Sequence, residues 1–278
     1  MTEQGFVRSQ ARRFLDRHPY CCFCGGAEPA TTVEHQPSRI VFPGKHRPKG
    51  MEYPSCQRCN DQTRAAEALL SFMCRMGGSM RTGADTDLPT FKKTLKSVER
   101  SFPGLLARMN MGQRYIRSAG GVLQPSRAVN GNQSEIHISL CRVAAMGALA
   151  AFYERGKGAA TEACRIVTSW THIQNREIAP NVERLLNIMG EAALLRQGAW
   201  ETSTTFFRKT HEAQNAIAFL SIYHETVALI AKLYARGGAD IVPPEVAGMY
   251  TFRPDRSQGL VITDGVGARD RHLRPSLR

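Results

Sequence analysis

The clearest chemical signal in the sequence is two pairs of cysteines, with two residues between the partners of each pair. The pairs are Cys21 with Cys24 and Cys56 with Cys59. Each short turn directs two thiolates toward one point, and Zn²⁺ prefers tetrahedral coordination by sulfur. The sequence therefore predicts a structural Zn²⁺ ion held by these four thiolates, with Cys22 as an alternative to Cys21. Since four protein ligands leave no open position, the expected role of the ion is in folding.

Polar residues suited to hydrolysis lie between and directly after these pairs. Glu34 and His35 are adjacent within residues 33–37, and Asn60 follows the last cysteine. Histidine accepts a proton near neutral pH, and the oxygens of Glu and Asn suit a hard divalent cation. Adjacent side chains of an extended segment point to opposite faces. Glu34 and His35 therefore share one site only if the strand is twisted or bulged, or if they reach it from different sides. Asn60 is also a good N-cap for the helix expected after it.

This arrangement resembles the HNH (ββα-metal) endonuclease family, in its variant with paired zinc knuckles, and more narrowly a group of uncharacterised bacterial HNH-like proteins. The matching frame covers about a fifth of the chain and reads Cys21-x-x-Cys24, Glu34-His35-x-Pro37 and Pro54-x-Cys56-x-x-Cys59-Asn60. The resemblance implies a β-hairpin packed on a helix around one divalent cation. It also implies that His35 is the general base and that Glu34 and Asn60 hold Mg²⁺ or Mn²⁺ against the scissile phosphate.

The sequence departs from the family pattern at one place. Many members carry an asparagine about five residues before the third cysteine, where it braces the catalytic loop. Met51 stands there in this chain, with Glu52 beside it. A thioether does not donate the hydrogen bonds of an amide. Glu52 therefore takes over the role, the loop is braced otherwise, or the activity is weak.

The charge of the chain indicates a polyanionic partner. The formal net charge is +13, from 37 Lys and Arg against 24 Asp and Glu. A balance of this kind favours nucleic acid, or else only a generally basic surface. The densest positive segment is residues 91–117, and its C-terminal half contains Arg108, Arg114 and Arg117. The expected phosphate contacts are Arg39, Lys45, Arg47, Lys49, Lys92, Lys93, Lys96 and Arg100. DNA is the expected nucleic acid, and no feature indicates readout of bases.

Hydrophobic periodicity predicts an α+β fold in three parts. Residues 1–85 form the zinc-binding HNH module, with a hairpin between the cysteine pairs and a helix that ends at the glycines at 77–78. Residues 86–250 form a mainly helical domain with a possible small sheet around 202–234, and residues 251–278 form a basic, loosely ordered tail. Runs of β-branched residues at 31–33 and 40–41 are the expected hairpin strands, and residues 119–134 are an expected loop. The helices are expected at about 5–17, 61–76, 91–102, 136–155, 159–174 and 181–197.

Targeting signals are not evident in the sequence. The N-terminal arginines have no apolar segment behind them, and the longest uncharged stretch, about 143–153, is short of the ~20 residues of a membrane span. A cytoplasmic location without a membrane partner is the expectation, and a reducing compartment suits unpaired cysteines. The predicted function is hydrolysis of nucleic-acid phosphodiester bonds by a metal-dependent HNH-type endonuclease. The alternatives are a non-catalytic zinc-knuckle protein that binds nucleic acid, and an interaction protein in which zinc only stabilises the fold.

Overall fold

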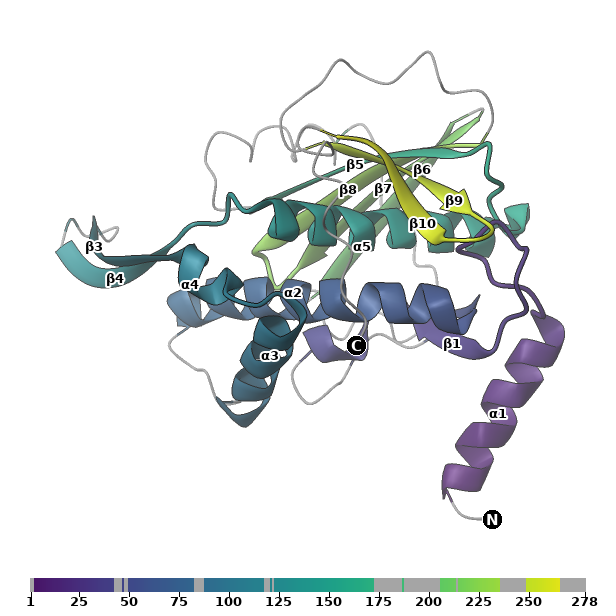
Figure 1. Cartoon of the computed structure of the whole chain (residues 1–278), viewed down its shortest axis with the longest axis horizontal. Coiled ribbons are helices and arrows are strands. Elements are labelled where there is room, and N and C mark those ends of the chain that lie inside the picture. Colours follow the sequence, from purple (N-terminus) through teal and green to yellow (C-terminus); the bar gives the residue numbers. More distant parts are fainter. Residues whose placement is uncertain are drawn as a thin grey trace.

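Three layers make up the part of the chain that the structure describes. The computed structural model describes residues 3–42, 47, 50–82, 88–117, 121, 123–172, 187, 206–213, 215–235 and 249–265. A six-stranded antiparallel sheet forms one layer, and the long helix α5 (Ser134–Phe152) lies across it (Figure 1). Helix α2 (Gln57–Thr82) packs on the other side of α5. One apolar core runs through all three layers.

The N-terminal module consists of a helix, a cysteine turn, a hairpin and a second helix. Its elements are α1 (Glu3–Arg17), β1 (Thr32–His35), β2 (Glu52–Ser55) and then α2. The strands pair antiparallel, with Glu34 opposite Tyr53 and His35 opposite Glu52. The hairpin between the cysteine pairs is therefore confirmed. Residues 40–41, expected as one of its strands, instead belong to a 3-10 turn (Arg39–Val41).

Two helices and a hairpin follow α2. They are α3 (Leu88–Ser101), α4 (Leu105–Met109), β3 (Asn110–Arg117) and β4 (Leu123–Val129). The predicted helix before Pro103 is confirmed. Two other expectations are wrong: α2 continues through Gly77 and Gly78, and much of the loop expected at 119–134 is strand β4.

The C-terminal region is mainly an antiparallel sheet, so the expectation of a mainly helical domain is wrong. Its strands are β5 (Arg165–His172), β6 (Phe206–Ala213), β7 (Ala216–Tyr223), β8 (Val227–Tyr234), β9 (Tyr250–Asp255) and β10 (Gly259–Gly265). They lie in the order β10-β9-β5-β8-β7-β6. The helix expected at 159–174 is instead a turn and β5. The tail expected from residue 251 is β9 and β10 as far as 265, and the helix expected at 181–197 lies almost wholly outside the described residues.

The composition of these segments explains the strands. Residues 165–172 read Arg-Ile-Val-Thr-Ser-Trp-Thr-His, which is rich in the β-branched and aromatic residues that favour strands. Tyr250 and Phe252 alternate with polar residues, and the partner strand carries the apolar run Leu260, Val261 and Ile262. Asp255 closes the turn between β9 and β10 by accepting hydrogen bonds from the amides of residues 257 and 258.

Helix α5 is the central element of the core. Almost every side chain from Ile136 to Ala151 is buried, because the helix has α2 on one side and the sheet on the other. At Gly147 the backbone lies so close to the sheet that a Cβ atom would come within 2.3 Å of Cζ of Phe219. Among the described residues, Ser134–Lys157 is one segment long and apolar enough to cross a membrane, but 72% of its most apolar window is buried inside the protein.

Polar contacts connect the N-terminal module to the sheet. Arg208 on β6 donates to Glu154 Oε2 (2.6 Å) at the end of α5 and to the hydroxyl of Tyr53 on β2 (3.2 Å). On the other side of the module, Gln62 of α2 accepts a hydrogen bond from the amide of Leu260 (3.2 Å). The apolar core is continuous across residue 85, and the division into domains at that residue stays a prediction.

Candidate functional site

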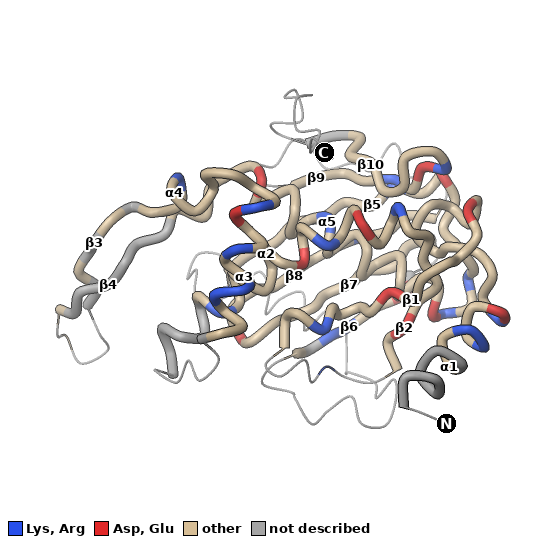
Figure 2. The backbone as a smooth tube through the Cα atoms, turned by 60° about the horizontal axis from the view of Figure 1, so that its bottom comes forward, with Lys and Arg blue, Asp and Glu red and all other residues tan. Residues whose placement is uncertain are grey.

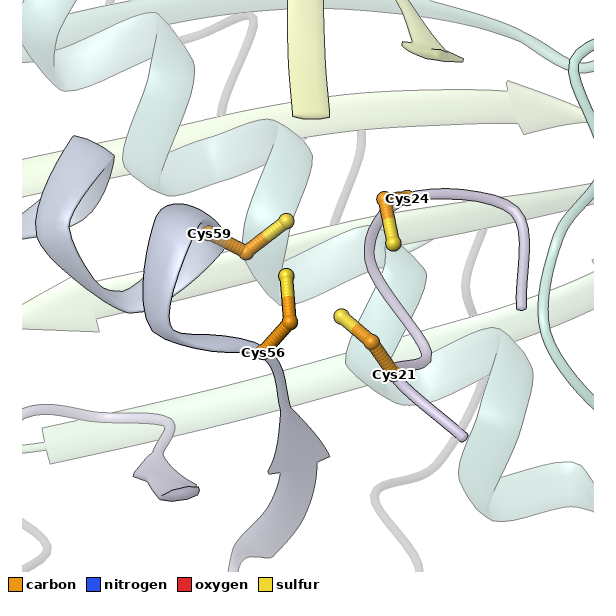
Figure 3. Close-up of side chains that lie close together, drawn as sticks. All are labelled: Cys21, Cys24, Cys56 and Cys59. Carbon is orange, nitrogen blue, oxygen red and sulfur yellow. The ribbon is translucent and has the colours of Figure 1, made fainter. Parts of the chain in front are cut away.

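The four predicted cysteines converge on one point. Cys21 and Cys24 come from the turn before β1, Cys56 immediately precedes α2, and Cys59 lies in its first turn (Figure 3). All four are buried, and their Sγ atoms lie within 4.8 Å of one another. Tetrahedral coordination with Zn–S bonds of about 2.3 Å requires sulfurs about 3.8 Å apart. The buried cluster is therefore consistent with a structural zinc ion, as the sequence predicted.

Backbone geometry shapes the first cysteine turn for this purpose. Gly25 has φ of +82° and Gly26 φ of +72°, a conformation that residues with a side chain rarely adopt. The turn directs the amide of Phe23 to Cys21 Sγ at 3.4 Å. Cys22 is buried beside the cluster but is not part of it, which decides between the two alternatives in favour of Cys21.

The thiols of the cluster share their protons. Hydrogen bonds from Cys21 and Cys59 lower the pKa of Cys24 to about 4. The same set of contacts raises the pKa of Cys59, because its proton lies between neighbouring sulfurs. Negative charge thus accumulates at one buried point, where a divalent cation compensates it. The chemistry of the donor set fits Zn²⁺.

On strand β1, Glu34 faces helix α2 and not solvent. Its side chain is 5% exposed and hydrogen-bonds the carboxyl group of Glu67, which is 9% exposed. Burial raises the pKa of Glu34 to about 7, and burial together with the charge of Glu34 raises that of Glu67 well above its usual range. Two buried carboxyl groups in contact share a proton, since both do not ionise at once. Ser38 also hydrogen-bonds Glu67.

His35 points away from this pair and contacts an arginine. Arg47 donates from Nη2 to Nδ1 of His35 (2.9 Å) and to Oε1 of Glu52 (2.7 Å), and its own side chain is only 7% exposed. Burial, Arg47 and Arg39 lower the pKa of His35 to about 3. A guanidinium has no acceptor, so Nδ1 must accept and the ring proton must lie on Nε2. His35 is therefore neutral at pH 7, with its acceptor nitrogen occupied.

Asn60 lies near the start of α2, where it binds neither Glu34 nor His35 in the described contacts. Its Nδ2 donates to Oγ1 of Thr32 (3.1 Å), which joins the helix to strand β1. Because α2 begins at Gln57, Asn60 lies inside the helix and the alternative role as N-cap is wrong.

The two candidate oxygen ligands of a catalytic cation do not converge in this conformation. Asn60 and Glu67 are seven residues apart on α2, which is about 10 Å along the helix axis. Glu34 is bound to the second of these residues and not to the first. The donor types suit Mg²⁺ or Mn²⁺, but their positions do not form a site for one ion.

The predicted phosphate contacts fall into three groups. Lys92, Lys93, Lys96 and Arg100 are exposed on α3, while Phe91, Leu95 and Val98 pack in the core. Figure 2 shows the basic positions of α3 in blue. Arg39 is also exposed, whereas Arg47 is engaged with His35 and Glu52. Lys45 and Lys49 lie outside the described residues.

Sequence reasoning missed the residues that hold this region together. Glu67 was one of them, although a carboxylate among Ala66, Ala68 and Leu69 in an otherwise apolar stretch of the sequence is an available signal. Arg208 was another, and it carried no local signal because its partners lie 54 and 155 residues away.

Comparisons of the chain with models of protein families, with curated proteins and with solved structures found no match. Within the described residues, the four cysteines are the one group of three or more His, Cys, Asp or Glu side chains whose ligand atoms converge.

Proposed function

We propose that this protein is a metal-dependent endonuclease of the HNH type, which hydrolyses phosphodiester bonds of nucleic acid, with DNA as the expected substrate and His35 as general base. The observation that carries the proposal is a β-hairpin followed directly by a helix, clamped at one corner by four cysteines, with the Glu-His pair at the end of β1. This is the order of elements that the sequence resemblance implies.

The surroundings of His35 suit an anionic substrate. Arg39 is exposed nearby, and Arg47 bridges His35 to Glu52. Guanidinium groups bind phosphate oxygens in paired hydrogen bonds. A phosphodiester that engages Arg47 competes with His35 for the same donor group. Release of Nδ1 frees its lone pair, and the nearby anion raises the pKa of the ring, which makes His35 a better proton acceptor near neutral pH.

A second candidate function is binding of nucleic acid without cleavage. Two contacts favour it: Nδ1 of His35 is occupied by Arg47, and Glu34 is bound to Glu67. The two functions differ in whether substrate and cation rearrange these contacts. In either function, the exposed cations of α3 contact the phosphate backbone.

A plasmid-nicking assay with the full-length zinc-loaded protein separates the two functions. Mg²⁺ or Mn²⁺ is added to protein purified without them, because a chelator would also remove Zn²⁺. His35→Ala is compared with His211→Ala, a matched substitution of an exposed histidine on β6. The proposal predicts cation-dependent nicking that falls about 100-fold or more in His35→Ala and is unchanged in His211→Ala.

Binding is measured in parallel on the same proteins. Duplex binding by wild type without nicking under either cation supports the second candidate and contradicts the first. If the wild-type protein does not bind the duplex even at low salt, both candidates are contradicted and an interaction protein is favoured.

A further inference from the structure

The hairpin formed by β3 and β4 extends away from the three layers, and we name residues 110–129 the arm. It lies at one end of the molecule, while β1 and α1 lie at the other (Figures 1 and 2). Its two strands pair with each other, and α4 packs at its base, where Asn130 N donates to the carbonyl of Met109 (2.7 Å). The arm is therefore a two-stranded ribbon that joins the rest of the molecule at its base, and its described residues Gly112, Tyr115 and Leu123 are exposed.

The composition of the arm combines positive charge with apolar residues. No Asp or Glu occurs between Glu99 and Glu135, and the arm itself carries Arg114, Arg117 and Arg127. Its backbone register places Arg114 opposite Ser126 and Arg117 opposite Leu123. Tyr115 is 69% exposed and Leu123 is 58% exposed, two of the three exposed large hydrophobic residues of the described chain. Positive charge and apolar surface thus occur together on a projecting element.

We propose that the arm binds double-stranded DNA by entering the major groove. A major groove about 12 Å wide admits a two-stranded β-ribbon, and arginine is suited to both phosphates and the guanine edge. Eight residues of β3 extend about 26 Å, which is enough to cross the groove. The deep, narrow major groove of an RNA duplex does not admit such a ribbon. Charge complementarity is the reason for choosing DNA over a protein partner.

The arm and the basic face of α3 lie on the same side of the β1 strand. Along the long axis of the molecule, α3 lies between the arm and β1 (Figures 1 and 2). A duplex held by the arm is thus near a second set of cations, and the arm fixes it at the end remote from His35. This inference rests on the proposed function only in taking nucleic acid as the partner, because it concerns binding and not cleavage.

Fluorescence anisotropy with a labelled 30-base-pair DNA duplex tests the inference in the absence of Mg²⁺. Arg114→Ala/Arg117→Ala is compared with Arg12→Ala/Arg13→Ala, a matched loss of two charges on exposed positions of α1. We expect the arm variant to weaken duplex binding about tenfold or more and to lower the slope of log affinity against log salt by about 2. The α1 variant should remain close to wild type. Thermal unfolding checks that both variants fold, and Tyr115→Ala provides a second arm variant without charge loss, expected to weaken binding several-fold.

Three outcomes would overturn the inference. Equal affinities and salt slopes for the arm and α1 variants would remove the arm from the interface. An equal loss on the duplex and on single-stranded DNA of the same sequence would exclude a groove. A change of oligomeric state in the arm variants by light scattering, with DNA affinity unchanged, would show that a second copy covers the arm. None of these measurements depends on nicking, so they test the arm even if the protein has no nuclease activity.

Discussion

The cysteine corner and strand β1 are two polar regions of one small module, and they are organised in opposite ways. At the corner, four side chains of one type converge on a point and share their protons. On β1 and the start of α2, the three candidate catalytic residues each bind a different partner: Glu34 binds Glu67, His35 binds Arg47, and Asn60 binds Thr32. The cysteine cluster needs no group of a substrate, whereas the function of the other three residues depends on what displaces their partners.

The difference shows how the module divides stability from reactivity. A closed tetrathiolate site holds the chain without contacting a substrate. Side chains that hydrogen-bond each other beside it are held in place but are exchangeable, because each contact contributes only about 1 kcal/mol net. The following predictions change one region at a time, from the largest expected effect to the smallest.

Removal of one cysteine ligand should have the largest effect. Cys56→Ala is expected to lose the zinc ion and the cooperative unfolding of the N-terminal module, because binding of a structural metal is coupled to folding. Metal analysis and calorimetry measure both. The matched control is Cys22→Ala, a buried cysteine outside the cluster, which should keep one zinc ion per chain. Full zinc content in Cys56→Ala would contradict the assignment of the ligands.

The Glu34–Glu67 pair should make stability depend on pH. Folding raises the pKa of Glu34 from 4.5 to about 7. The contribution of this carboxyl group to stability is therefore full below pH 4.5 and is lost as the pH rises through 7. Glu34→Gln removes this loss and should raise the free energy of unfolding above pH 7 by on the order of 3 kcal/mol relative to wild type. Denaturant titrations from pH 4 to 8 measure it.

Asp16→Asn, on the exposed face of α1, is the control for this prediction and should leave the pH profile unchanged. Parallel pH profiles of Glu34→Gln and wild type would show that the two carboxyl groups do not share a buried proton.

The Arg47 guanidinium should control the titration of His35. Arg47→Met keeps much of the apolar stem but removes the charge and the donor to Nδ1, so the pKa of His35 is expected to rise from about 3 by about one unit or more. Burial of the ring remains and keeps the pKa below its ordinary value. NMR titration of the imidazole protons measures the shift, and Arg13→Met on α1 is the control. An unchanged His35 titration would argue against the contact.

The smallest effect is expected at Asn60. Asn60→Ala and Thr32→Val each break the hydrogen bond between these two side chains, at a cost of about 1 kcal/mol, with a coupling of similar size in a double-mutant cycle. Thr32→Val also removes the hydrogen bond that Thr32 Oγ1 donates to the carbonyl of Ser55, so its total cost should be larger. Their activities distinguish two roles of the amide. If Asn60 only joins α2 to β1, both variants nick plasmid equally; if it also binds a cation, only Asn60→Ala loses nicking.

The parts predicted from the sequence are those in which local spacing determines geometry. The cysteine cluster, the hairpin between its halves and α5 follow from spacings of two to seven residues. The strands β5, β9 and β10 are not predicted from the sequence. Ile166, Trp170 and Phe252 have high β propensity, but the apolar spacing around β5 also fits a helix, and the basic residues after β10 indicate a tail. The Glu34–Glu67 and Arg208 contacts depend on the packing of α2 and the sheet, which no single segment encodes.

Gly147 links the sheet to the cysteine cluster. It lets α5 lie against the ring of Phe219, and α2 rests on the opposite side of α5. A larger residue at this position must displace the ring of Phe219 or α5 itself, and a displacement of α5 would move α2, and with it Cys59, relative to the turn that carries Cys21. Substitution of this buried glycine is thus coupled to the affinity of the cysteines for zinc. Excess zinc should therefore partly restore the stability of Gly147→Ala.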